Sequence, residues 1–219
     1  MIVVFSGVDG AGKSTQIDLL KEQIEGQGLS VISVWSRGGY TPGFELLKKF
    51  LRIALGKKVI SSGKSARRDK IMSKSFVNYL WLIMAMLDLL ILYAIIFRVK
   101  SLLGKVVICD RYLGDTFIDF SLNFPNSNFE KMWLWRLLVA MSPKPDIGFL
   151  FILPVEESIR RSKLKKEPFP DSRDTLKSRI DIYQTHRLFK GENWAIIDGI
   201  HSIDFSADII KKYCFNEQS

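Results

Sequence analysis

A glycine-rich run near the start of the chain has the residue types and spacing of a phosphate-binding loop. Residues 7–14 read GVDGAGKS, which fits the pattern G-x-x-x-x-G-K-[ST] without a gap. Glycines let backbone N–H groups converge on phosphate oxygens, Lys13 can reach the β- and γ-phosphates of a nucleotide, and Ser14 can bind Mg²⁺. We therefore predict that this loop binds a nucleoside triphosphate. The predicted cofactor-binding residues are Gly7, Val8, Asp9, Gly10, Ala11, Gly12, Lys13, Ser14 and Thr15.

A second group of candidate residues follows the apolar run Val106–Cys109. Asp110 comes directly after this run, and an acid at the end of a parallel strand faces the crevice where it can hold Mg²⁺ or its waters. Its neighbour Arg111 could clamp a phosphate. The alternative is that Asp110 caps the next element and Arg111 is solvated.

A parallel sheet must position these residues. Apolar runs alternate with helical patterns along the chain, which predicts an α/β fold with a doubly wound parallel sheet and right-handed crossovers. No internal repeat or linker interrupts the pattern, so we predict a single domain over 1–219. The predicted strands are Met1–Ser6, Leu29–Trp35, Val106–Cys109, Ile147–Leu153 and Trp194–Ile197. The predicted helices are 13–27, 44–55, 67–103, 114–122, 129–142, 155–166, 173–190 and 205–213.

Composition and charge narrow the class of protein. The chain has 219 residues, of which 47% are hydrophobic, and this excludes a disordered or fibrous chain. The formal net charge is +9. Residues 57–74 hold seven basic side chains and one acidic one, and residues 160–179 hold eight basic side chains and three acidic ones. The rest of the chain is therefore nearly neutral. An anionic partner is expected, and the net charge alone is compatible with a nucleotide, a nucleic acid or an acidic membrane.

The two cysteines and the N-terminus indicate a cytoplasmic protein. Cys109 and Cys214 are too few for a disulfide framework, and each lies in an apolar context that suits a buried thiol. The chain begins with a short β-branched run that leads directly into the glycine motif, without the basic region of a signal peptide.

The apolar run 76–97 has two interpretations besides a core helix. Between Leu80 and Phe97 the only charged residue is Asp88, so the run is long enough for a membrane span. An acid at its middle is costly in hydrocarbon, and the run lies inside one α/β succession. We expect a helix that is buried in the core and in a dimer interface, and we keep membrane contact as an alternative.

The motifs together resemble the thymidylate kinase family of nucleoside monophosphate kinases. The resemblance rests on GVDGAGKSTQ at 7–16, VVICDRY at 106–112, RIDIY at 179–183 and AIIDG at 195–199. It implies a three-layer P-loop kinase fold with a five-stranded parallel sheet, ATP and Mg²⁺ as cofactors, a small-molecule phosphate acceptor and a homodimer through the 76–97 helix. Nucleic acid is not expected as a partner.

The resemblance also assigns catalytic roles. Lys13 and Ser14 would serve ATP and Mg²⁺, with Asp110 as a second metal-binding residue; Asp9 matches a loop acid near the acceptor sugar, and Arg111 matches an arginine that bridges phosphates. The family meets the charge of the transferred phosphoryl group with an arginine in the loop or on a lid. This loop has no arginine, so an Arg-rich lid at about 160–175 would supply it. The candidates are Arg160, Arg161 and Arg173.

The acceptor site departs from the family pattern. After the second strand the chain reads RGGYT at 37–41, where Arg37 and Tyr40 are predicted to bind the acceptor. The family reads thymine with an arginine on the long helix, but no arginine occurs between Arg68 and Arg98, and Asp88 falls near that position. A mismatched polar group in a base pocket changes which base binds.

We therefore predict ATP- and Mg²⁺-dependent phosphoryl transfer to a nucleoside monophosphate. One alternative is a kinase of the same fold with a sugar or lipid-linked alcohol as acceptor. Another is a nucleotide-binding protein at a membrane surface that has no kinase activity.

Overall fold

The computed structural model describes residues 1–36, 75–166 and 170–215. They divide into two compact units. The first comprises 1–36, 99–118 and the described part of 144–219, and the second comprises 75–98 and 119–143. The single domain over 1–219 stays a prediction.

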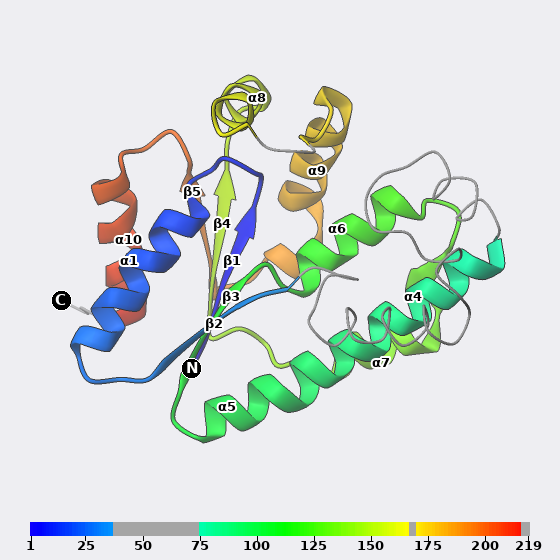
Figure 1. Cartoon of the computed structure of the whole chain (residues 1–219), viewed down its shortest axis with the longest axis horizontal. Coiled ribbons are helices and arrows are strands. Elements are labelled where there is room, and N and C mark those ends of the chain that lie inside the picture. Colours follow the sequence, from blue (N-terminus) through cyan, green and yellow to red (C-terminus); the bar gives the residue numbers. More distant parts are fainter. Residues whose placement is uncertain (37–74, 167–169, 216–219) are drawn as a thin grey trace. The chain divides into compact units, whose positions relative to one another are not determined.

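A five-stranded parallel sheet organises the first unit (Figure 1). Its strands lie in the order β2-β3-β1-β4-β5, so the chain crosses over between neighbours, as predicted for a doubly wound sheet. The strands are β1 (Ile2–Gly7), β2 (Val31–Trp35), β3 (Val106–Asp110), β4 (Ile147–Ile152) and β5 (Trp194–Asp198). The prediction of a five-stranded α/β fold is confirmed.

The central strand β1 brings three strand ends together. It pairs with β3 on one side and β4 on the other, and all six of its residues are buried. In this register Phe5 lies opposite Asp110, and Asp110 lies opposite Trp35 of β2. Because the strands are parallel, their carboxyl ends meet at one edge of the sheet, where ligands bind in such folds.

Helices cover both faces of the sheet and this edge. α1 (Lys13–Gly26) and α10 (Ile203–Phe215) lie on one face, whereas α9 (Arg173–Thr185) lies on the other (Figure 1). α6 (Leu113–Asn123) follows β3, and α8 (Val155–Leu164) lies across the carboxyl ends of the strands. The sheet and its helices form the three layers expected for the fold.

A long helix and a shorter one form the core of the second unit. α4 (Ser75–Leu90) continues into a π-helical stretch, η1 (Ile91–Phe97), and then into α5 (Arg98–Leu102). α7 (Trp133–Met141) packs against α4 and η1, and the Arg98 Nη2 donates to the Met141 carbonyl at 2.9 Å. Trp81 packs its ring against Phe124 at a centroid distance of 5.1 Å, which places it in the core of this unit.

Two predicted helices are shorter in the structure. The run 129–142 begins as a 3-10 turn, η2 (Phe129–Lys131), and the α-helix starts only after Met132, whose ψ of 135° is extended. The run 173–190 ends at Thr185, because His186 has a ψ of 137°, and the turn η3 (Arg187–Phe189) follows. The helical spacing of apolar residues continues across both breaks, so periodicity did not reveal them.

Both cysteines are free thiols of low reactivity. Cys109 is fully buried in β3, and burial raises the pKa of its thiol. Partial burial raises the pKa of Cys214 to about 12. Neither forms the thiolate that reacts or binds metal near neutral pH.

The long helix is apolar enough to cross a membrane by length and composition alone. Among the described residues this stretch is Asn78–Leu102, with a mean hydropathy of 2.5 in its most apolar window, a third of which is buried. A soluble protein's core helix meets the same criterion, so this is weak evidence of a span.

Candidate active site

The loop between β1 and α1 has the backbone that a phosphate-binding loop requires. Gly10 and Gly12 have φ values of 80° and 94°, in the left-handed region that favours glycine. Gly7 has a φ of 132°, and a Cβ added there would lie 2.1 Å from the Phe151 carbonyl oxygen. Only glycine therefore lets the loop leave β1 so close to β4.

Lys13 lies beneath this loop with its side chain buried. Its Nζ donates to the carbonyl oxygens of Val8 at 2.7 Å and Gly7 at 3.0 Å. Burial, and to a smaller extent the charge of Arg111, lowers the pKa of Lys13 to about 8. The ammonium group is thus held at the loop with little solvation, where phosphate oxygens would stabilise its charge.

Asp110 supplies an acidic group to the same place. Its Oδ1 is buried and has no hydrogen-bond partner in the described part of the chain. Burial raises the pKa of this carboxyl group, against the lowering effect of Lys13 and Arg111. A buried oxygen without a partner and the exposed Ser14 hydroxyl beside the same pocket are oxygen ligands of the kind that Mg²⁺ prefers, so the donor set fits this metal.

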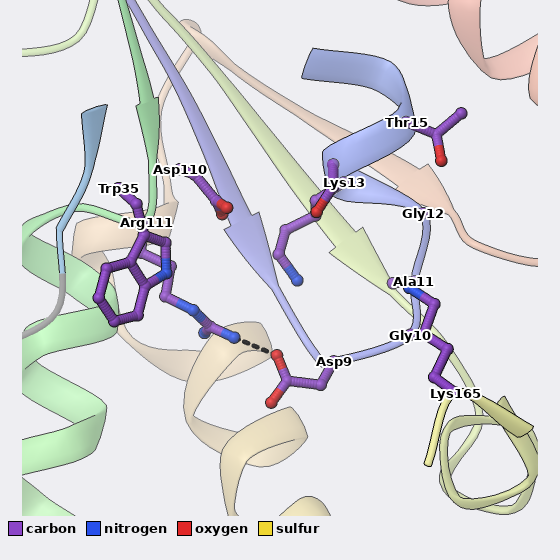
Figure 2. A pocket seen from close by; sticks show the side chains of 11 residues that line it. Asp9, Gly10, Ala11, Gly12, Lys13, Thr15, Trp35, Asp110, Arg111 and Lys165 are labelled. Carbon is purple, nitrogen blue, oxygen red and sulfur yellow. Dashed lines mark hydrogen bonds and ion pairs between the residues drawn. The ribbon is translucent and has the colours of Figure 1, made fainter. Parts of the chain in front are cut away.

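Arg111 completes the group from the opposite side of the pocket. Its backbone has a φ of 74°, a left-handed conformation that is uncommon for arginine and costs on the order of 1 kcal/mol. The side chain is buried, and its Nη2 forms an ion pair with Asp9 of the loop, as Figure 2 shows. The pocket has a volume of about 200 Å³. Its lining is Asp9, Gly10, Ala11, Gly12, Lys13, Ser14, Thr15, Trp35, Asp110, Arg111 and Lys165.

Helix α8 holds the loop from outside the pocket. The Ser158 hydroxyl donates to the Asp9 carbonyl at 2.8 Å, and the Arg161 Nη1 donates to the Gly10 carbonyl at 3.1 Å. Hydrogen bonds from Arg160 and Arg161 lower the pKa of Glu157 to about 2. The first two turns of α8 therefore form an ordered support for the loop.

The three predicted lid arginines have different surroundings. Arg161 contacts the loop as described, while Arg160 is bound to Glu157 through two nitrogens at 2.7 Å and is largely exposed. Arg173 pairs with Glu156, also at 2.7 Å, on an exposed surface. Of the lid segment, the described lining of the pocket includes Lys165 instead (Figure 2). The catalytic roles of the three arginines stay predictions.

The other predicted acceptor residues are Arg37, Tyr40 and Asp88. Arg37 and Tyr40 lie outside the described residues, as does the basic segment 57–74. Asp88 lies partly buried on α4 in the second unit.

Sequence reasoning missed four residues of the site. Trp35 and Lys165 line the pocket, and Asp115 and Tyr183 contact the buried side of Arg111. Trp35 ends a predicted strand, and its place at the carboxyl end of a parallel strand is the signal that could have found it. Asp115 lies one helical turn after Arg111, which is a usual spacing for an ion pair.

The chain is similar over most of its length to proteins named thymidylate kinase. No family model matches it. It is 28% identical to the thymidylate kinase of Bartonella henselae, an alignment that covers 97% of this chain and 94% of that protein. It is 28% identical to the probable thymidylate kinase of Methanocaldococcus jannaschii, in an alignment that covers 90% of this chain and 86% of that protein. It is 32% identical to the probable thymidylate kinase of Pyrococcus horikoshii, in an alignment that covers 74% of this chain and 70% of that protein. The resemblance inferred from the motifs is confirmed, and the chain belongs to the thymidylate kinase family.

Proposed function

We propose that this protein is a phosphotransferase that moves the γ-phosphoryl group of ATP onto a nucleoside monophosphate. The observation that carries this proposal is the convergence of Lys13, Asp110 and Arg111 on one pocket over a phosphate-binding loop. Two cations and a row of backbone N–H groups suit the triphosphate, and phosphoryl transfer needs mainly positioning and charge neutralisation. The related proteins named above, which are thymidylate kinases by name, support a nucleoside monophosphate as the acceptor.

Five residues of the pocket have a part in this reaction. Lys13 binds the β- and γ-phosphates, and Arg111 neutralises phosphate charge on the acceptor side. Asp9 holds Arg111 in the structure and faces the same space. Ser14 and Asp110 would hold Mg²⁺, which supplies positive charge to the phosphates when bound.

We assign part of the lid's role to Lys165. Its side chain lines the same pocket as Gly10 and Ala11 of the loop (Figure 2). A cation there adds positive charge at the edge of the pocket, while Arg161 fixes the loop backbone through Gly10.

The function is tested by measuring ADP release with a panel of acceptors. The panel contains thymidine monophosphate, the other nucleoside monophosphates, nucleosides, sugars and a lipid alcohol, and Lys13→Ala serves as the blank. We expect turnover with at least one nucleoside monophosphate and none in the blank. Turnover restricted to a sugar or an alcohol would contradict the proposed acceptor, and no turnover above the blank would contradict the kinase function.

We also propose a homodimer that forms through the long helix. α4 and η1 carry exposed Leu87, Ile91 and Ile95, and Trp133 of α7 is 72% exposed. A group of large apolar side chains in solvent marks an interaction surface. The cytoplasmic location stays a prediction.

A further inference from the structure

The carboxylate of Asp115 is buried on the side of Arg111 away from Asp9, with only 1% of its side chain exposed. One oxygen, Oδ2, accepts from the Ser6 hydroxyl at 2.6 Å and from the Tyr112 backbone N–H at 3.0 Å. The other, Oδ1, accepts from the Tyr183 hydroxyl at 2.6 Å and from Arg111 at 3.4 Å. Both carboxylate oxygens thus accept hydrogen bonds from residues that are themselves buried.

The two terminal nitrogens of Arg111 have different surroundings. Nη1 contacts three buried groups: Asp115 Oδ1 at 3.4 Å, the Tyr183 hydroxyl at 3.4 Å and the Gly7 carbonyl at 3.5 Å. Nη2 pairs with Asp9, which lines the pocket. Nη1 is therefore held by buried groups, while Nη2 is directed at the pocket where phosphate would bind.

Tyr183 links this arrangement to the phosphate-binding loop. Its hydroxyl is also 3.2 Å from the Gly7 carbonyl, which accepts from Lys13 as well. Burial and the charge of Asp115 raise the pKa of Tyr183, so the hydroxyl keeps its proton and stays a donor. The ring packs against Phe189 at a centroid distance of 4.9 Å, which holds the hydroxyl in place.

We propose that Asp115 and Tyr183 are positioning residues for phosphoryl transfer, which fix Nη1 of Arg111 so that Nη2 faces the phosphates. Neither residue touches a phosphate itself. The inference rests on the proposed function, because it assigns Arg111 to phosphate charge. Asp9 pairs with Nη2 at the pocket, and the buried carboxylate of Asp115 supplies a second opposing charge beside Nη1. Without this second charge the buried guanidinium would shift toward Asp9 and the solvent, because a buried charge with a weaker counter-charge is costly. A displacement of about 1 Å in such a group can lower a rate by about 100-fold.

The first test is Asp115→Asn, which keeps the shape of the side chain and removes its charge. We expect kcat to fall at least about tenfold while the Kd for ATP changes less than about twofold. The matched control is Asp146→Asn, because the Asp146 carboxylate accepts from the Ile2 backbone N–H at 2.6 Å at the opposite end of β1. A kcat within twofold of the wild-type value in Asp115→Asn would overturn the proposal.

A second variant covers the case in which Asp115→Asn does not fold. Tyr183→Phe removes one hydroxyl and keeps the ring packed against Phe189. We expect kcat to fall at least about threefold with the Kd for ATP unchanged. Tyr213→Phe is the matched control. Tyr213 lies on α10 and is half exposed, and its ring packs against Phe149 of β4. Equal kcat in both tyrosine variants would overturn the role of Tyr183.

A double-mutant cycle separates positioning from a general structural role. If Asp115 acts through Arg111, then Asp115→Asn lowers kcat less than about twofold in an Arg111→Lys background. Additive losses in the cycle would overturn the proposal.

A further readout does not depend on turnover. In ¹⁵N-arginine NMR of the wild-type protein we expect slow rotation about the Nε–Cζ bond of Arg111, and fast rotation in Asp115→Asn. Fast rotation in the wild type would overturn the proposal. Absent wild-type turnover would overturn the proposed function instead, and the NMR comparison would still decide the positioning roles.

Discussion

At the scale of single residues, the site depends on charges that are held with little solvent. Lowering the pKa of Lys13 from 10.5 to about 8 corresponds to about 3 kcal/mol of unfavourable free energy for its charged form. This cost applies fully below pH 8, and it disappears as the pH rises toward 10.5, where both the folded and the unfolded chain lose the proton. Bound phosphates offset the cost, because they stabilise the ammonium group.

ATP affinity should therefore depend on pH. Phosphates favour protonated Lys13, so the Kd for ATP should be constant up to pH about 8 and rise by up to about tenfold per pH unit above it. Fluorescence titration between pH 7.5 and 9.5 would measure this. Lys13→Arg keeps its charge over the range, and its Kd should not change with pH. A wild-type Kd that stays constant to pH 9.5 would show that Lys13 does not titrate there.

Lys165 should matter more to the rate than its neighbours on the lid. We expect Lys165→Ala to lower kcat about 100-fold with the Kd for ATP changed less than about threefold, because the variant removes a positive charge that lines the pocket and would stabilise the transferred phosphoryl group. Lys163→Ala, an exposed change two residues earlier in the last turn of α8, is the control. Steady-state kinetics of these variants and of Arg160→Ala, Arg161→Ala and Arg173→Ala would rank the lid residues. A larger loss in one of the arginine variants would move the role to that arginine.

At the scale of elements, the strand pattern could be predicted well and the helix ends less well. The apolar runs of the five strands are short, and those of β1, β3 and β4 are mostly buried on both faces. Each strand was predicted within two residues of its observed ends. The same pattern led to Asp110, because an acid that follows a buried parallel strand lies at the edge of the sheet where the carboxyl ends of the strands meet. Breaks at Met132 and His186 depend on the backbone torsion of one residue, which periodicity does not report.

Contacts between elements could not be predicted from local patterns. The hydroxyl of Tyr183 reaches Asp115, which is 68 residues away in the chain, only because α9 and α6 meet at the end of β1. Which basic side chain of α8 faces the pocket depends on the rotation of that helix about its axis. Ser158 and Arg161 face the loop, and this orientation leaves Lys165 beside the pocket.

The junction between β1 and the loop gives a prediction at this scale. Gly7→Ala should lower the free energy of unfolding by more than about 3 kcal/mol and abolish ATP binding, because the added methyl group overlaps the Phe151 backbone at a positive φ. Gly26→Ala in α1 is the control, since a Cβ there meets nothing within 4 Å. Urea denaturation and ATP titration would compare the two variants. Equal stability of both would contradict the close approach of β1 and β4.

At the scale of the whole molecule, the chain combines a basic site with a long apolar helix in which Asp88 is the one charged residue between Leu80 and Phe97. The net charge of +9 fits an anionic substrate, and part of it lies in the pocket as Lys13, Arg111 and Lys165. The apolar helix has no part in that electrostatic role. About a third of its most apolar window is buried, and Leu87, Ile91 and Ile95 are among its exposed side chains.

We expect the partner of this helix to be a second copy of the chain. Replacing exposed Ile91 with lysine places a charge in the proposed interface, where burial without an opposing charge costs several kcal/mol, so Ile91→Lys should be monomeric at micromolar concentration. Ile196→Lys is the control, because Ile196 is 70% exposed on β5 and lies in the other unit. Light scattering coupled to size exclusion would give the masses. A monomeric wild-type protein would contradict the dimer, and nucleotide-independent sedimentation with vesicles at high salt would show that the helix binds a membrane surface instead.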